Sequence, residues 1–470
     1  MDNDSTPGKL SILETLRLLG SASRGSWLVN LVNFADGVAY FGMLALMTLF
    51  MEHNVGFSTQ ASTISISLFT GAVTIFMALG GGTISDRLGV RRALTLSLVL
   101  VLVGRIILTV APNASGGAGF AAMVALVIMA SGEGTIQPAL YSGIKEYTDP
   151  RVTTMGFAVL YAIMNLGIVA GELLSPMMRE VYARDVQGLN VQEHPAAGIA
   201  GAFWFFIVVT AATLVLHLVL FTRKVEERDR VIRVGPQEKA EVGLWERMRS
   251  LPIMDGRFLF FIFILIPVRT LFAHQWLTMP TYVTRAFPPD VGARWEWING
   301  LNPLIIVVFV PLFAALTRQR HIVDMMIIGT LVSAAASFLL VFEPNLPLLL
   351  IYVVVWSLGE ALWSSRFLEY IAEIAPAGKI GVYMGLATIP WFLAKSITGF
   401  YAGTMLDIFV PESGPQDPGG MWFLYGMTAL ISPLGLMLAR QWLLSKERNC
   451  NLGTGAPPAA RNPKAIPIDQ

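Results

Sequence analysis

Charged residues are scarce in this chain, and their scarcity excludes the largest class of proteins. Only 14% of the 470 residues are charged, whereas a water-soluble domain has about 25%. Hydrophobic residues make up 54% of the chain, and the mean hydropathy is +0.61. The charges cluster between long uncharged runs. An ordinary soluble enzyme is therefore excluded, and the composition is that of a membrane protein.

Cysteine, net charge and catalytic sequence motifs are also lacking. The only cysteine is Cys450, so no internal disulfide can form. The 33 Lys and Arg residues balance 32 Asp and Glu residues, and the net charge of +1 offers no basic field to nucleic acid. The chain contains no His-Glu-x-x-His, Gly-x-Ser-x-Gly or P-loop sequence. We therefore expect no enzyme activity, no cofactor, no metal and no nucleic-acid partner.

Twelve apolar windows are each long enough to cross a membrane, which takes about 20 residues. They are 27–51, 61–84, 93–111, 119–141, 153–177, 199–222, 258–283, 295–316, 322–342, 346–366, 381–409 and 421–444. We predict an all-α integral membrane fold, with twelve transmembrane helices in two pseudo-symmetric six-helix bundles. The expected segments are a cytoplasmic N-terminal segment (1–26), an N-terminal bundle (27–222), a cytoplasmic linker (223–257), a C-terminal bundle (258–444) and a disordered cytoplasmic tail (445–470).

The distribution of Lys and Arg predicts the orientation, because basic residues are retained on the cytoplasmic side. With both termini cytoplasmic, only four of the 33 basic residues fall in outer loops, namely Arg179, Arg184, Arg285 and Arg294. We expect the protein to reside in the cytoplasmic (inner) or plasma membrane and to work as a monomer.

The loop after the second predicted span combines small residues with a charge cluster. It runs from Gly81 to Arg92 and contains Gly82, Asp86, Arg87, Gly89, Arg91 and Arg92. Small residues let two helices approach closely, and one carboxylate among three arginines can form a latch at the cytoplasmic rim. The segment resembles the loop 2–3 signature of the major facilitator superfamily, and Ala314–Arg320 is its degenerate counterpart in the second half. The resemblance implies two six-helix repeats around a solute site.

A narrower resemblance covers most spans. Its motifs are Phe34–Met43, which includes Tyr40-Phe41-Gly42-Met43; Tyr161–Gly167, with Asn165; Asn299–Ile305, with Asn302; and Leu358-Gly359-Glu360. These stretches are similar to motifs of the proton-dependent oligopeptide transporters. The coupling residues of that family differ here at three places. The span 1 motif Glu-x-x-Glu-Arg is replaced by Asn33-Phe34-Ala35-Asp36-Gly37, and the span 4 lysine is replaced by Gln137. In span 7, His274 stands before Gln275 where the family usually has an acid.

Ionisable residues inside spans are costly to bury and suggest function. Glu360 is the candidate for a cationic amine, Asn165 and Asn302 for amide groups, and Arg269 or Lys395 for a carboxylate. Tyr40 and Gln275 are further candidates for substrate contact, and Asp36, Glu133 and His274 are candidate proton carriers. We also predict an ion pair of Glu360 with Arg269 or Lys395 and interpret Arg105 as a partner of Glu133.

The sequence thus predicts a secondary transporter that moves a small peptide-like or zwitterionic solute by alternating access. Three alternatives stay open: an exporter of amphipathic or cationic compounds, a facilitator without proton coupling, and a receptor that no longer transports. Because three coupling positions have changed chemistry, we expect coupling through His274 with a buried acid, or weak coupling. A histidine switch requires a neighbouring carboxylate, since desolvation alone opposes protonation.

Overall fold

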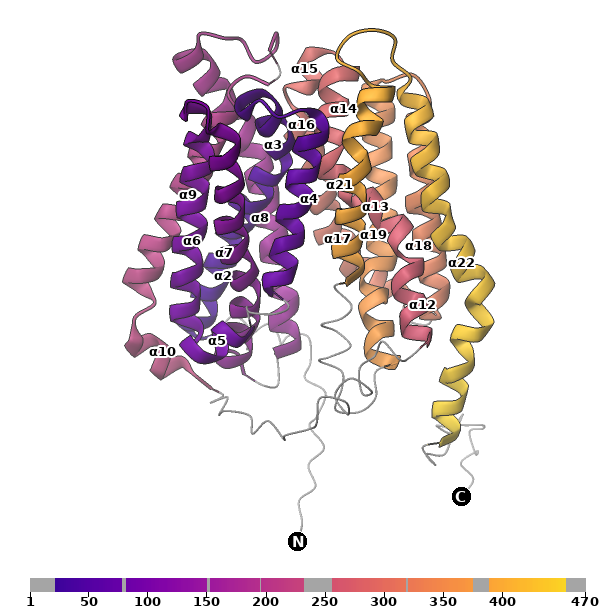
Figure 1. The fold of residues 1–470 in the computed structure, drawn as a ribbon. Coiled ribbons are helices and arrows are strands. Elements are labelled where there is room, and N and C mark those ends of the chain that lie inside the picture. The colour runs from indigo at the N-terminus through magenta and orange to yellow at the C-terminus, as the bar shows by residue number, and fades with distance from the viewer. Residues whose placement is uncertain are drawn as a thin grey trace, which may run out of the picture.

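The computed structural model describes residues 22–453 except 78–81, 150–152, 195, 232–255, 318–319 and 375–388. Within these ranges every regular element is helical, and eleven helical segments are long and apolar enough to span a membrane. The helices form two side-by-side bundles (Figure 1). The predicted all-α membrane fold is therefore confirmed.

The N-terminal bundle begins at a serine cap, because the Oγ atom of Ser23 accepts a hydrogen bond from the N–H of Ser26. Its first span is interrupted by π-helical turns. The elements of this bundle are α2 (Arg24–Asp36), η1 (Gly37–Phe41), α3 (Gly42–Phe50), η2 (Met51–Val55), α4 (Thr59–Phe76), α5 (Gly82–Leu88), α6 (Val90–Val110), η4 (Ala111–Asn113), α7 (Ala118–Tyr147), α8 (Thr153–Tyr182), η6 (Ala183–Gln187) and α9 (Ile199–Leu220).

The short helix α10 (Arg223–Asp229) follows and lies against the N-terminal bundle. The C-terminal bundle comprises α12 (Gly256–Ile264), α13 (Ile266–Leu277), α14 (Met279–Ala286), α15 (Pro289–Gly292), α16 (Trp295–Asn299), α17 (Leu301–Leu316), α18 (Ile322–Ala336), η8 (Ser337–Val341), α19 (Leu346–Ile374), α21 (Ile389–Phe409) and α22 (Pro418–Gly453). A large buried core of aromatic and aliphatic side chains holds this bundle together.

The predicted windows overlap the observed helices, and three differences bear on the predictions. The window 381–409 corresponds to α21, whose described part carries Lys395 and Asp407 and is not among the eleven segments apolar enough to qualify as spans. Helix α8 continues to Tyr182, so Arg179 is helical and buried rather than part of an outer loop. Helix α22 continues to Gly453, past the predicted start of the tail at 445.

Glycines allow the first and fifth spans to touch through their backbones. A Cβ atom on Gly167 would lie 2.2 Å from the carbonyl oxygen of Phe34, and one on Gly37 would lie 2.5 Å from that of Met164. Such distances are too short for non-bonded atoms, so α8 and the first span can pack this closely only without side chains at these positions.

We expect Gly167→Ala to lower the stability of the folded protein by about 1–3 kcal/mol, because the added methyl group forces the two helices apart. The measurement is the melting temperature of the purified protein in detergent. Gly117→Ala is the matched control, since a Cβ atom there would meet nothing within 4 Å. Equal melting temperatures for the two variants would show that the helix crossing tolerates the methyl group.

Candidate functional site

Hydrogen bonds between the two bundles are concentrated towards one end of the described structure. We call the end that carries α14, α15 and α16 the distal end; α5 and α10 lie at the opposite end (Figure 1). Among the described residues, all hydrogen bonds between the bundles lie in the distal halves of the spans or near the middle. They join α3 to α13, α4 to α14 and α21, α8 to α16, and η2 to α14. The structure is therefore closed at the distal end.

A buried ion pair lies at the centre of this distal closure. The Nη1 atom of Arg179 in α8 lies 2.8 Å from each carboxylate oxygen of Glu296 in α16, and both side chains are fully buried. Ser175 also donates to Glu296, at 3.2 Å. One turn away, the side-chain amide of Asn299 donates to Glu172 at 2.8 Å. These contacts link opposite bundles across a site that water does not reach.

A second contact group closes the distal end around Arg285. Its Nη2 atom lies 3.5 Å from a carboxylate oxygen of Glu52 and donates to Thr59 at 2.7 Å. The sequence analysis assigned Arg179 and Arg285 to outer loops and so missed both groups. A signal for these contacts was present in the sequence. Glu52, Glu172 and Glu296 each lie near the end of an apolar window, where an acid is costly to bury unless it has a polar or cationic partner.

Inside the N-terminal bundle, three charged side chains meet. The Nη2 atom of Arg105 in α6 lies 2.8 Å from a carboxylate oxygen of Glu133 in α7 and 3.8 Å from one of Asp36 in α2. The Nη1 atom of Arg105 donates to the hydroxyl of Thr210 in α9. All three charged groups are buried. We call Asp36, Arg105 and Glu133 the acid-pair cluster.

The acid-pair cluster holds two carboxyl groups against one guanidinium. Asp36 and Glu133 are close enough to hydrogen-bond each other, which requires a proton on one of them. Gln137 also reaches Asp36, and the half-buried Tyr40 lies close enough to both acids to interact electrostatically. The predicted pairing of Arg105 with Glu133 is confirmed, and this arrangement can hold or release one proton.

In the C-terminal bundle, Glu360 of α19 is bound by an amide rather than by a cation. The Nδ2 atom of Asn302 in α17 donates to Glu360 at 2.7 Å and also lies 3.0 Å from the Oγ atom of Ser357. Arg269 of α13 is near enough to interact electrostatically with Glu360, but the two form no ion pair in the described part of the chain. The predicted ion pair of Glu360 with Arg269 or Lys395 is therefore not formed among the described residues, where the hydrogen bond to the carboxylate comes from Asn302 through one oxygen.

Tyr161 and Asn165 of α8 lie on the side of the N-terminal bundle that faces Glu360. The Asn165 side chain is buried and donates to the carbonyl oxygen of Tyr161, one turn earlier, at 2.9 Å. The Tyr161 side chain is 45% exposed and close enough to Glu360 to interact electrostatically. The structure therefore brings Asn302 to Glu360 directly, whereas Asn165 reaches this region only through Tyr161.

Aromatic rings surround the guanidinium of Arg269. Its central carbon lies 5.0 Å from the ring centre of Trp363, 4.4 Å from that of Phe367 and 4.6 Å from that of Trp391. Lys395 lies one turn after Trp391 on α21 and is half-buried. Its ammonium has no hydrogen bond or ion pair among the described residues.

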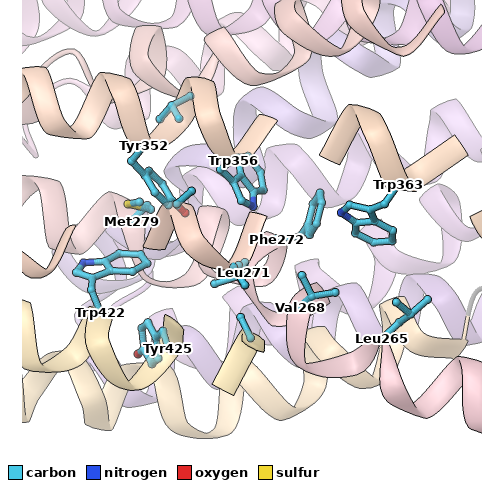
Figure 2. Close-up of a cluster of buried hydrophobic side chains, with 14 of the residues drawn as sticks. Leu265, Val268, Leu271, Phe272, Met279, Tyr352, Trp356, Trp363, Trp422 and Tyr425 are labelled. Atoms are coloured by element: carbon cyan, nitrogen blue, oxygen red, sulfur yellow. The ribbon is translucent and has the colours of Figure 1, made fainter. Parts of the chain in front are cut away.

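His274 and Gln275 lie in the aromatic core of the C-terminal bundle. The ring nitrogens of His274 contact the hydroxyls of Thr278 at 2.7 Å and Tyr401 at 3.0 Å. Its ring stacks on Tyr425, with ring centres 3.9 Å apart. Gln275 donates to the hydroxyl of Tyr352 at 3.0 Å. Figure 2 shows Tyr352, Trp422 and Tyr425 in this core. No carboxylate contacts His274 in the described residues, so the neighbour that a histidine switch requires is not present.

The predicted latch residues lie at the end opposite the distal closure. Helix α5 begins at Gly82, and Gly89 has a φ of +77°, which favours glycine, just before α6. Arg91 pairs with Glu226 of α10 at 3.1 Å, whereas Arg87 and Arg92 are exposed. The side chain of Asp86 lies outside the described residues. The arginine that forms an observed contact thus ties α6 to α10.

Comparison with known proteins agrees with this architecture. The chain is 21% identical over 392 residues to an uncharacterised MFS-type transporter, YhjO, of Bacillus subtilis, and the match covers 83% of this chain and 86% of the relative. It is 21% identical over 443 residues to dipeptide and tripeptide permease B of Photorhabdus luminescens, covering 83% and 89%.

Solved structures show the same fold. A POT family transporter in complex with 5-aminolevulinic acid superposes with a TM-score of 0.67 at 18% identity, covering 90% of this chain and 97% of the other. A mutant of the nucleoside transporter NupG gives the same TM-score of 0.67 at 11% identity, covering 88% and 99%. The sequence model of the Major Facilitator Superfamily matches residues 29–399. The chain therefore belongs to the major facilitator superfamily.

Proposed function

We propose that this chain is a secondary transporter that carries a small zwitterionic or peptide-like solute by alternating access. The observation that carries the proposal is the position of Glu360. Its carboxylate is buried inside the C-terminal bundle and faces Tyr161 of the opposite bundle. In the described part of the chain, the hydrogen bonds that join the bundles lie towards the distal end. A buried acid between two bundles that can rock against each other suits a site exposed to alternate sides.

Glu360 is suited to hold the amine of the solute. Asn302 orients the carboxylate through one oxygen and leaves the other available to a cation. Tyr161 lies near the same carboxylate, and the side chain of Asn165 donates a hydrogen bond to the carbonyl oxygen of Tyr161. The names of several relatives, dipeptide and tripeptide permeases, support a solute that carries an amine.

The acid-pair cluster is suited to carry the coupling proton. Two carboxyls and one guanidinium carry a charge of −1 when both acids are ionised, and binding one proton makes the cluster neutral. Binding or losing this proton changes the electrostatic free energy of the cluster strongly, because a charge inside a bundle is poorly solvated. Coupling through Asp36 and Glu133 thus replaces the predicted route through His274, whose ring contacts hydroxyls.

The orientation and setting follow from the same proposal. In this proposal both termini and the 223–257 linker lie in the cytoplasm and the distal end faces outward, an orientation that the distribution of basic residues supports. The 27–222 and 258–444 segments are the two moving bundles, in the inner or plasma membrane. The described structure is then the inward-facing state of a monomer.

The test is solute counterflow in proteoliposomes for wild type and Glu360→Gln, with dialanine and a panel of amphipathic cations. We expect dialanine exchange by wild type and a loss of about ten- to a hundredfold in Glu360→Gln, because the substitution keeps shape but removes the charge that binds the amine. Exchange of the cations but not of dialanine would indicate an exporter. No exchange of either would indicate a receptor.

A further inference from the structure

We propose that Arg269, held in its aromatic cage of Trp363, Phe367 and Trp391, binds the carboxylate of the solute, with Lys395 as the second cation of this subsite. This inference rests on the proposed transport function and names the chemical class that the site selects: solutes that carry a free carboxylate together with an amine. It also places both ends of the solute against the C-terminal bundle.

The guanidinium of Arg269 is buried with only part of its hydrogen-bonding capacity used. The Arg269 side chain is 2% exposed, and its Nε and Nη1 atoms have no hydrogen-bond partner among the described residues. Aromatic rings attract a cation through their faces, but they cannot accept the in-plane N–H bonds as a carboxylate does. Arg269 is therefore held in position while its edge stays available to an anion.

Glu360 and Arg269 lie near each other but form no ion pair among the described residues. A buried cation usually has a carboxylate partner, and Glu360 is the acid that acts on Arg269 electrostatically. Glu360 nevertheless accepts its hydrogen bond from Asn302 at 2.7 Å. The two opposite charges thus lie near each other without a direct contact. A zwitterion can bind both, with its amine at Glu360 and its carboxylate at Arg269.

Lys395 lies where the two bundles meet. It follows Trp391 by four residues on α21, so the two side chains share one helix face. Its carbonyl oxygen accepts a hydrogen bond from Ser67 of α4 at 2.8 Å. Lys395 therefore adds a cation beside the cage and next to the N-terminal bundle.

The charge balance of the bundles agrees with this assignment. Glu360, Arg269 and Lys395 carry a net charge of +1, whereas the acid-pair cluster carries −1 when both acids are ionised. An anionic group belongs with the first set. In the N-terminal bundle the guanidinium of Arg105 is already paired with Glu133 at 2.8 Å, so it is not available to a carboxylate of the solute.

The experiment compares inhibition of dialanine counterflow by unlabelled dialanine and by its C-terminal amide. We expect wild type to prefer the acid by about ten- to a hundredfold, because the amide lacks the charged acceptor for Arg269. In Arg269→Gln the preference should fall by most of this factor, through weaker binding of the acid and not of the amide, with Lys395 left as the remaining cation. Arg269→Lys should keep part of the acid preference, because lysine retains the positive charge but lacks the planar guanidinium that binds a carboxylate through two hydrogen bonds.

Three outcomes separate this inference from the proposed function. Wild type that exchanges no dialanine overturns the function itself. Wild type that exchanges dialanine but binds acid and amide equally overturns the carboxylate subsite, even if every variant misfolds. An acid preference that survives in Arg269→Gln but disappears in Lys395→Gln overturns the role of Arg269.

Discussion

Arg179→Ala is expected to open the distal end of the transporter. The substitution leaves the carboxylate of Glu296 buried between the bundles without its cation, and breaking such a pair costs about 3–5 kcal/mol. This cost falls on the closed distal state only, because the ion pair joins opposite bundles. The population should therefore shift towards the state that is open at the distal end by about a hundredfold or more.

The measurement is labelling of a cysteine by a membrane-impermeant maleimide applied from the distal side. Ser67→Cys in a Cys450→Ser background places the thiol at the contact of α4 with α21, where Ser67 is 3% exposed. Arg184→Ala is the matched control, because the Arg184–Asp185 pair is exposed to solvent and does not join the two bundles. Equal labelling rates in the Arg179 and Arg184 variants would contradict a latch at Glu296.

Glu133→Gln is expected to abolish concentrative uptake while counterflow of the same solute continues. The amide keeps the shape and the hydrogen bond to Arg105 but cannot exchange a proton, so the acid-pair cluster no longer changes charge during the cycle. Asp36→Asn should have the same effect, because the one carboxylate that remains in either variant faces the guanidinium of Arg105 alone and stays ionised. The measurement is dialanine accumulation in proteoliposomes driven by an acid-outside pH gradient.

His274→Gln is the matched control for this prediction, because it changes a buried titratable group that lies outside the acid-pair cluster. We expect it to retain gradient-driven accumulation. Loss of accumulation in His274→Gln, with normal accumulation in Glu133→Gln, would return coupling to the histidine. Equilibration without accumulation in wild type would identify a facilitator.

The sequence predicted the fold well because the membrane fixes the length and composition of each span. The windows for α6 and α9 agree with the helices to within a few residues. It failed where an arginine ends a span, because positive charge was taken as the sign of a loop. For Arg179 the partner is Glu296, 117 positions away and in the other bundle, and no local pattern reveals such a pair.

The candidate site was predictable in its residues but not in its contacts. Depth in the span identified Asp36, Glu133, Glu360 and Arg269, since burial of a charge is costly wherever it occurs. Which groups meet depends on how the helices are rotated and shifted. Trp363 and Phe367 are four residues apart on α19, so two of the three rings of the aromatic cage have a local signal, whereas Trp391 comes from another helix.

The π-helical turn at Gly37–Phe41 gives the first span two independent facing directions. A π turn contains one residue more than an α turn, and one residue corresponds to a rotation of about 100°. Before the turn, Asp36 faces Arg105 in its own bundle; after it, Thr48 donates to the carbonyl oxygen of Trp276 in the other. The extra residue thus sets the rotation of the second half of the span relative to the first. Deleting one residue from this segment would turn either Asp36 away from Arg105 or Thr48 away from Trp276.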